Sequence, residues 1–202
     1  MREVHAREED GGDDPPPPAE GACFDEAVRR GLQVRPANQR QQNPDGRPDI
    51  ECRQPEAVHL SSPVNGARWR YFTHDTAQDT FMACRLALAL DDFGDLLAEH
   101  EVVEVEHLGV YNCRLIGDTD EPSEHAYARA IDPSAFIFSD GSRCTVEDDW
   151  EGLHDEAQTL CGQLLQDIAW DLHMRRIFNV VLTPDYDAAH YNHFHVDLTP
   201  GS

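Results

Sequence analysis

Six cysteines lie far apart from one another along this chain of 202 residues. Their number is even, and no two form the Cys-x-x-Cys pair that structural zinc sites and thioredoxin-like redox sites use. We therefore expect disulfides and an extracytoplasmic protein, periplasmic or secreted, although no apolar export signal is visible in the sequence. Buried free thiols in a cytosolic protein are the alternative, and the spacing does not select a pairing. The six residues are Cys23, Cys52, Cys84, Cys113, Cys144 and Cys161.

The charge balance excludes several classes of function. Asp and Glu number 39 against 16 Arg and Lys, which gives a formal net charge of -23. This charge repels nucleic acids and anionic membrane surfaces. Every basic residue is Arg, so Schiff-base chemistry and the lysine-containing phosphate-binding loop are also excluded. No apolar run approaches the ~20 residues of a membrane-spanning helix. We expect a globular protein without a membrane-spanning segment, and a monomer.

Composition divides the chain into a tether and one domain. Residues 1–21 are acidic and contain four consecutive prolines, which predicts a disordered, extended tether. Residues 22–199 are predicted to form the domain. Within it, residues 22–63 have little periodicity and carry Cys23 and Cys52, which could close this stretch into one loop. We interpret residues 22–63 as a disulfide-stapled N-terminal extension that caps the main fold.

The hydrophobic pattern predicts an α+β fold, a small and largely antiparallel sheet flanked by helices. Leucine and phenylalanine at three- and four-residue steps predict a helix that follows Thr76 and a second helix over about residues 152–174. Alternation predicts a strand over 103–106, and an Asp-Gly turn between 135–138 and 143–146 predicts a hairpin. Two more strands are expected at residues 178–182 and 192–198.

Histidines gather near the C-terminus, at His190, His193 and His195. Residues two apart in a strand face the same way, so His193 and His195 are expected to project side by side. Two adjacent imidazoles indicate metal binding or acid–base chemistry. A histidine-rich strand with a purely structural role is the alternative.

His125 and Asp132 form a second candidate pair, seven residues apart. Alone, they are equally typical of a surface histidine and a turn-forming aspartate. Combined with a downstream histidine, they give two imidazoles and one carboxylate. Three protein ligands leave the fourth position of a zinc ion open, which is the arrangement of catalytic rather than structural zinc.

The motifs around these residues resemble a known superfamily. SEHAYARAID and HFHVD resemble the two signature motifs of the zinc peptidases that include D-alanyl-D-alanine carboxypeptidases, the penicillin-insensitive murein endopeptidase and the hedgehog signalling domain. Ala128 stands where these motifs usually have Gly. More closely, YNCR, SEHAYARAID, the DG hairpin, DDW and LTPDYDAAHYNHFHVDL are similar to the bacterial extensin-like C-terminal domain family, over about residues 23–198.

This resemblance implies a zinc ion held by His125, Asp132 and His195. Many relatives have a carboxylate general base before the last ligand, whereas this chain has His190 there, as the murein endopeptidase type does, with His193 nearby. The base is therefore His193 or His190. Zinc would activate a water molecule and polarise the scissile carbonyl.

Other polar residues have two possible roles each. Arg114 corresponds to an arginine that precedes the first motif in relatives, and it could hold a substrate carboxylate or an oxyanion, or simply pair with surface acids. Ser123 could bind substrate or zinc ligands, or cap a turn. Asp197 could orient a ligand imidazole or be an exposed strand-end acid. Three further histidines are expected on the surface, His107, His154 and His173.

The expected function is a zinc-dependent hydrolase that cleaves peptide bonds of bacterial peptidoglycan, at D-amino-acid bonds or cross-links. A non-catalytic zinc-containing module that binds the cell wall is the first alternative. A disulfide-stapled interaction domain without zinc is the second.

Overall fold

The computed structural model describes residues 21–38, 42–154 and 156–201. The tether predicted for residues 1–21 lies outside these residues, apart from Gly21. Within the described residues, no helix has the length and apolar character that crossing a membrane requires.

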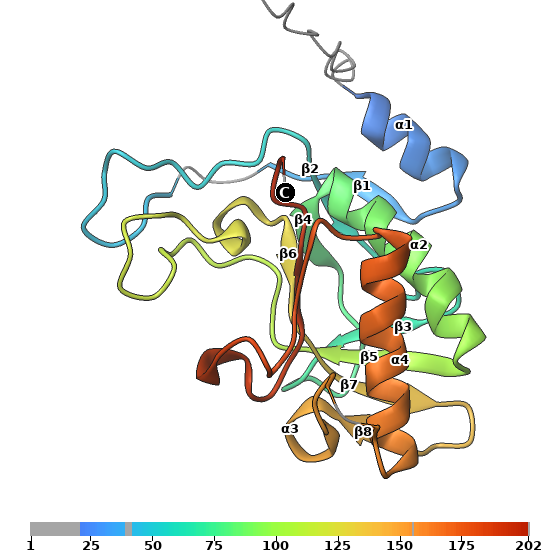
Figure 1. The fold of residues 1–202 in the computed structure, drawn as a ribbon. Helices are drawn as coiled ribbons and strands as arrows, with labels where there is room; N and C mark the ends of the chain where they lie inside the picture. The colour runs from blue at the N-terminus through green and yellow to red at the C-terminus, as the bar shows by residue number, and fades with distance from the viewer. Residues whose placement is uncertain (1–20, 39–41, 155, 202) are drawn as a thin grey trace, which may run out of the picture.

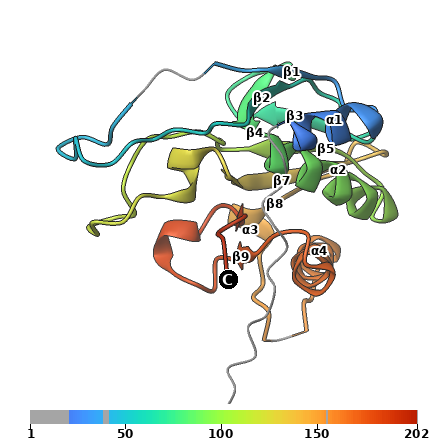
Figure 2. The ribbon, with the colours of Figure 1, turned by 90° about the horizontal axis from the view of Figure 1, so that it is seen from above.

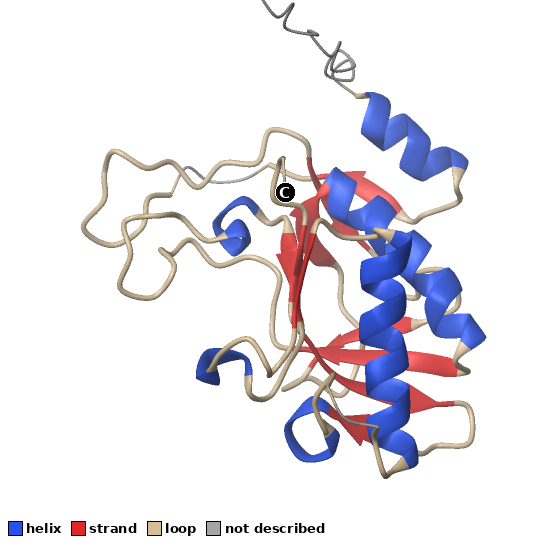
Figure 3. Cartoon of the chain, viewed as in Figure 1, coloured by secondary structure: helices blue, strands red, loops and turns tan. Residues whose placement is uncertain are grey.

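The predicted α+β class is confirmed, with helices and short strands mixed along the chain (Figure 3). The helices are α1 (Ala22–Arg29), α2 (Cys84–Glu99), α3 (Val146–Asp149) and α4 (Leu160–Arg175), with two 3-10 helices, η1 (Glu124–Tyr127) and η2 (Ala188–His190). The strands are β1 (Val34–Pro36), β2 (Ala57–Leu60), β3 (Arg68–Tyr71), β4 (Thr80–Ala83), β5 (Val102–His107), β6 (Ala130–Ile131), β7 (Pro133–Phe138), β8 (Arg143–Thr145), β9 (Val180–Leu182) and β10 (His195–Asp197).

The described strands form three small sheets rather than one. Their orders are β1-β2-β4, β6-β10-β9 and β3-β5-β7-β8, and each pairing is antiparallel except that of β3 with β5. In Figure 1, α2 and α4 lie next to each other on one side of these sheets. The opposite side consists mainly of long loops.

Helix α2 supplies much of the core. Leu86, Leu90, Phe93 and Leu97 recur on one face, as predicted, and each is at most 1% exposed. The residues before Cys84 form strand β4 instead of an earlier part of this helix. Burial of these four side chains, at roughly 1.5–3 kcal/mol each, anchors α2 on the sheets.

Helix α4 begins at Leu160, later than the predicted start at Gly152. Gly152 has φ 85°, a left-handed conformation that interrupts a helix. The carboxylate of Glu151 accepts the N–H of Thr159 at 3.0 Å, and the Thr159 hydroxyl in turn accepts the N–H of Gly162 at 3.0 Å. These bonds satisfy free N–H groups at the helix start, so the first turn forms at Leu160.

All six cysteines form disulfides, as predicted: Cys23–Cys84, Cys52–Cys113 and Cys144–Cys161. The first two bonds leave the stretch 22–63 for the rest of the domain, so the prediction that this stretch closes on itself is wrong. Its strands β1 and β2 are also part of the sheet that ends in β4.

Two long loops, residues 42–56 and 111–123, lie side by side in both ribbon views (Figure 1, Figure 2). The bond Cys52–Cys113 joins them. An ion pair of 2.9 Å links Arg47 to Asp120. Tyr111 is thereby held at the edge of the region where the candidate site forms, and its hydroxyl donates to Gln42 at 2.8 Å.

Candidate metal centre

Asp132 stands where the chain passes from one sheet to another. It is the single residue between β6, which pairs with β10, and β7, which pairs with β5. The N–H of Leu108 donates to its carbonyl at 2.9 Å and fixes its backbone. His195 begins the neighbouring β10. Antiparallel pairing of β6 and β10 therefore brings His195 beside Asp132, although 63 positions separate them in the sequence.

His125 reaches the same point from η1. Ser123 precedes this turn and its hydroxyl accepts the N–H of His125 at 3.3 Å, so Ser123 has the capping role, one of the two expected for it. Ala128 ends η1 with φ 53°, in the left-handed region. A residue with a Cβ costs about 1–2 kcal/mol there, whereas glycine would adopt this conformation without that cost.

Three side chains meet at one point and form what we call the donor cluster, His125, Asp132 and His195. Nε2 of His125 lies 3.0 Å from Oδ1 of Asp132, and Nδ1 of His195 lies 2.9 Å from the same oxygen. The two nitrogens are 3.1 Å apart. The side chains are at most 14% exposed. The structure thus brings together the three residues that the sequence predicts as ligands, and their atoms could hold one metal ion.

The outer nitrogen of each imidazole in the donor cluster has its own partner. Nδ1 of His125 lies 2.9 Å from the carbonyl oxygen of Val110, and Nε2 of His195 lies 2.9 Å from Oδ2 of Asp197. A carbonyl and a carboxylate only accept hydrogen bonds, so the outer nitrogens carry the hydrogens. The inner nitrogens then present lone pairs to each other and to Asp132. Three such acceptors in contact require a proton or a cation between them.

The carboxylates determine how the donor cluster titrates. Burial would lower the pKa of His195, but hydrogen bonds to Asp132 and Asp197 outweigh burial and raise this pKa to about 9. Burial would raise the pKa of Asp132, yet its bonds with the two histidines hold it well below the ordinary value. Bonds from His195 and Thr199 likewise outweigh burial and lower the pKa of Asp197. The donor cluster therefore attracts one positive charge.

His193 borders the donor cluster from outside β10. The strand predicted over residues 192–198 is shorter in the structure, so His193 precedes it and does not share a strand face with His195. Its Nδ1 lies 2.8 Å from Oδ1 of Asn192, and its Nε2 lies 3.9 Å from Oδ1 of Asp132. Burial lowers the pKa of His193, which favours the neutral imidazole near pH 7.

His190 lies next to His193, with ring centroids 5.2 Å apart. Its Nδ1 is 2.7 Å from Oδ1 of Asp187, and hydrogen bonding with His190 lowers the pKa of this carboxyl group. The sequence pattern did not identify Asp187 and Asn192 as partners of these histidines. The three-residue spacing of Asp187 and His190, typical of a helix cap and its first turn, is the signal that could have identified Asp187.

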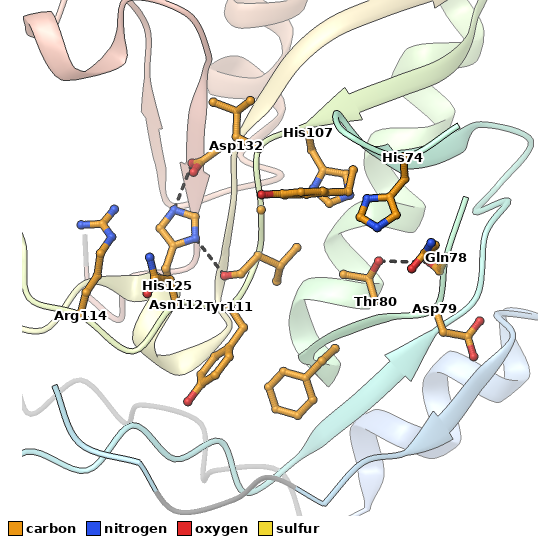
Figure 4. A pocket seen from close by; sticks show the side chains of 15 residues that line it. His74, Gln78, Asp79, Thr80, His107, Tyr111, Asn112, Arg114, His125 and Asp132 are labelled. Atoms are coloured by element: carbon orange, nitrogen blue, oxygen red, sulfur yellow. Dashed lines mark hydrogen bonds and ion pairs between the residues drawn. The ribbon is translucent and has the colours of Figure 1, made fainter. Parts of the chain in front are cut away.

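A cleft of about 450 Å³ runs past the donor cluster (Figure 4). His125, Asp132 and the segment 108–112 line it, together with Arg114. The guanidinium of Arg114 stands apart from Asp132 in Figure 4 and is exposed. Within the described residues it donates to the carbonyl of Leu115 at 3.1 Å and forms no ion pair. The structure therefore keeps Arg114 at the cleft but outside the donor cluster.

Two expectations about polar residues are resolved by burial. Asp197 is 4% exposed and bonded to His195, so the alternative of an exposed acid is wrong. His107, expected on the surface, is 3% exposed. It lies two positions after Val105 in β5 and therefore points to the same buried face. Burial lowers its pKa to about 4. His154 and His173 are exposed, as expected.

The domain matches one known family. A profile of the family described as Extensin-like protein C-terminus matches residues 22–201, which include the whole donor cluster and both neighbouring histidines. No curated protein and no solved structure matches the chain. The similarity to the wider zinc peptidase superfamily stays a prediction. On the match over nearly all of its described residues, the chain belongs to the extensin-like protein C-terminus family.

Proposed function

We propose that this protein is a zinc-dependent hydrolase that cleaves peptide bonds of bacterial peptidoglycan, at D-amino-acid bonds or cross-links. The observation that carries the proposal is the donor cluster, in which three acceptor atoms lie 2.9–3.1 Å apart while both outer imidazole nitrogens are already bonded. The choice of peptidoglycan rests on the motifs that resemble murein peptidases.

The donor set fits zinc. Two imidazoles and a carboxylate are ligands that zinc takes at about 2.0–2.2 Å, and in tetrahedral geometry atoms bound at that distance lie about 3.3–3.6 Å from one another. The three donor atoms are 2.9–3.1 Å apart, so they would separate by about half an ångström to hold the ion. Asp197 and the Val110 carbonyl bond the outer nitrogens of the ligand imidazoles, as the outer partners of metal-bound histidines do. Three protein ligands leave room for water or substrate at a fourth position.

In the proposed hydrolysis, His193 acts as the general base. A zinc ion supplies the Lewis acidity that activates water and polarises a scissile carbonyl. The Nδ1 of His193 is engaged by Asn192, so Nε2 is the nitrogen that takes the proton from the attacking water. The 3.9 Å distance between this Nε2 and Oδ1 of Asp132 puts His193 beside the donor cluster. Protonated His193 then returns the proton to the leaving amine.

Arg114 is the residue that would recognise the C-terminal carboxylate of the substrate. Its guanidinium lies at the cleft and forms no ion pair with any described residue, so it suits a substrate carboxylate, which a bidentate hydrogen-bond pair could hold. Such a contact would favour cleavage near a free C-terminus. We assign this role to Arg114 rather than oxyanion stabilisation, because its guanidinium stands apart from Asp132.

Zinc content and cleavage of muropeptides test the proposal together. The purified protein is expected to contain one zinc per chain by elemental analysis. It should release peptide fragments from muramidase-digested peptidoglycan, and a chelator should abolish this release. Bound zinc without chelator-sensitive cleavage would instead favour the non-catalytic cell-wall module. Absence of stoichiometric zinc after reconstitution would overturn both the hydrolase and the non-catalytic zinc module, and would favour a disulfide-stapled interaction domain.

Stabilisation by zinc is expected to increase between pH 6.5 and 9. Without metal, His195 has a raised pKa of about 9. Its proton therefore stabilises the fold fully below the unfolded value near 6.5, and this stability is lost as the pH rises through about 9. Zinc replaces this proton, so the affinity of the folded protein for zinc should rise by about tenfold per pH unit between pH 6.5 and 9. Urea unfolding with zinc and with chelator, at pH 6.5 and 9, measures the difference; an equal difference at both values contradicts it.

A further inference from the structure

His107 is a buried histidine that the mechanism above does not use. It is 3% exposed and lines the cleft, where Figure 4 shows it between Asp132 and His74. Among the described residues, its Nδ1 is fully buried and has no hydrogen-bond partner. A buried polar atom of this kind costs free energy, and native proteins contain few of them. Its retention at the cleft therefore needs a physical reason.

Trp69 provides the first part of the explanation. Its Nε1 is also buried and has no partner in the described part of the chain, and Trp69 and His107 line the same small cavity of about 10 Å³. This is about the space that one water molecule needs. An indole N–H only donates, so a water between the two residues would accept from Trp69 and donate to Nδ1 of His107. The hydrogen of the neutral His107 ring then sits on Nε2.

The cleft side of His107 provides the second part. Unlike Nδ1, the Nε2 atom of His107 is not a fully buried atom without a hydrogen-bond partner among the described residues. His107 also lines the cleft together with His125 and Asp132. Its lowered pKa keeps the ring uncharged. A neutral N–H in a cleft wall bonds well to an uncharged carbonyl oxygen, which is the acceptor that every peptide unit carries.

We propose that His107 is a substrate-binding residue whose Nε2–H donates a hydrogen bond to a backbone carbonyl of the peptide held in the cleft, while Nδ1 shares a buried water with Trp69. The identity of this peptide as a peptidoglycan peptide rests on the proposed function. The contact itself requires binding and no turnover. It would hold the chain that extends from the scissile bond along the segment 108–112.

Three substitutions of His107 distinguish the roles of its two ring nitrogens. Glutamine carries an amide N–H near the place of Nε2, asparagine carries one near the place of Nδ1, and phenylalanine retains the ring shape without a donor. The probe is a disaccharide-tetrapeptide muropeptide, titrated calorimetrically into zinc-loaded protein in a His193→Ala background to prevent its cleavage. We expect about tenfold weaker binding for His107→Phe and His107→Asn, and a loss within about threefold for His107→Gln.

Unfolding in urea provides the second readout. Because His107→Phe removes a costly buried polar group, its midpoint should equal or exceed that of the parent protein. Unchanged binding in His107→Phe, or a fall in stability without a change in binding, overturns the proposal and leaves a structural role. Failure of the proposed function has another signature, in which muropeptides bind with this His107 dependence but the wild-type protein does not cleave them.

Discussion

His195→Ala is expected to abolish stoichiometric zinc binding. His195 contributes one of three donor atoms, and its Nδ1 lies 2.9 and 3.1 Å from the other two. Loss of an outer-shell partner already costs about 10–100-fold in metal affinity, so loss of the ligand itself should exceed 100-fold. Competition with a chromophoric chelator at pH 7.5 measures the affinity.

A matched control for this variant is His154→Ala, which removes an exposed imidazole that belongs to no metal-binding group in the described chain. It should bind zinc as the wild-type protein does. The substitution His195→Ala also removes one of the two hydrogen-bond partners named above for Asp197, so circular dichroism must show a folded chain before the zinc loss is interpreted. Retention of zinc with near wild-type affinity would contradict the assignment of the donor cluster.

His193→Ala is expected to keep zinc and lose activity. Its Nε2 is 3.9 Å from Oδ1 of Asp132, beyond the distances within the donor cluster, so the imidazole is not needed to hold the metal. Loss of a general base lowers the catalytic rate by about 10²–10⁴-fold. The rate of chelator-sensitive muropeptide cleavage and the zinc content are measured on the same preparation.

His190→Ala tests the choice between the two histidines. His190 contacts the ring of His193 and is bonded to Asp187, so its removal should lower the rate less than removal of His193. A larger loss in His190→Ala would transfer the base role to His190. Equal loss of zinc in His193→Ala and His195→Ala would overturn the division between ligand and base.

Local patterns predicted much of the secondary structure. The face of α2 and the Asp-Gly hairpin of β7 and β8 follow from short-range periodicity and turn chemistry, which neighbouring residues determine. The predicted start of α4 was wrong. The carboxylate of Glu151 and the left-handed backbone of Gly152 delay the helix, although the apolar spacing begins before Leu160. Periodicity does not report such bonds.

Strand β5 extends beyond the predicted residues 103–106, and its alternation of buried faces includes His107. Its alternation predicted a half-buried strand over 103–106, and His107, the next residue, was expected on the surface. The period of two puts His107 on the same face as Val105, which is fully buried. Position in the strand determined its burial more than the polarity of its side chain.

The α+β class, the presence of disulfides and the three residues that meet in the donor cluster could all be predicted from the sequence. The pairing of the cysteines required the folded chain, because Cys23–Cys84 and Cys52–Cys113 both span 61 positions that no local pattern relates. The same holds for the donor cluster. The crossover of the chain at Asp132 and the pairing of β6 with β10 bring its atoms within 3.1 Å. Distances between residues far apart in the sequence depend on the packing of whole sheets, which a motif does not contain.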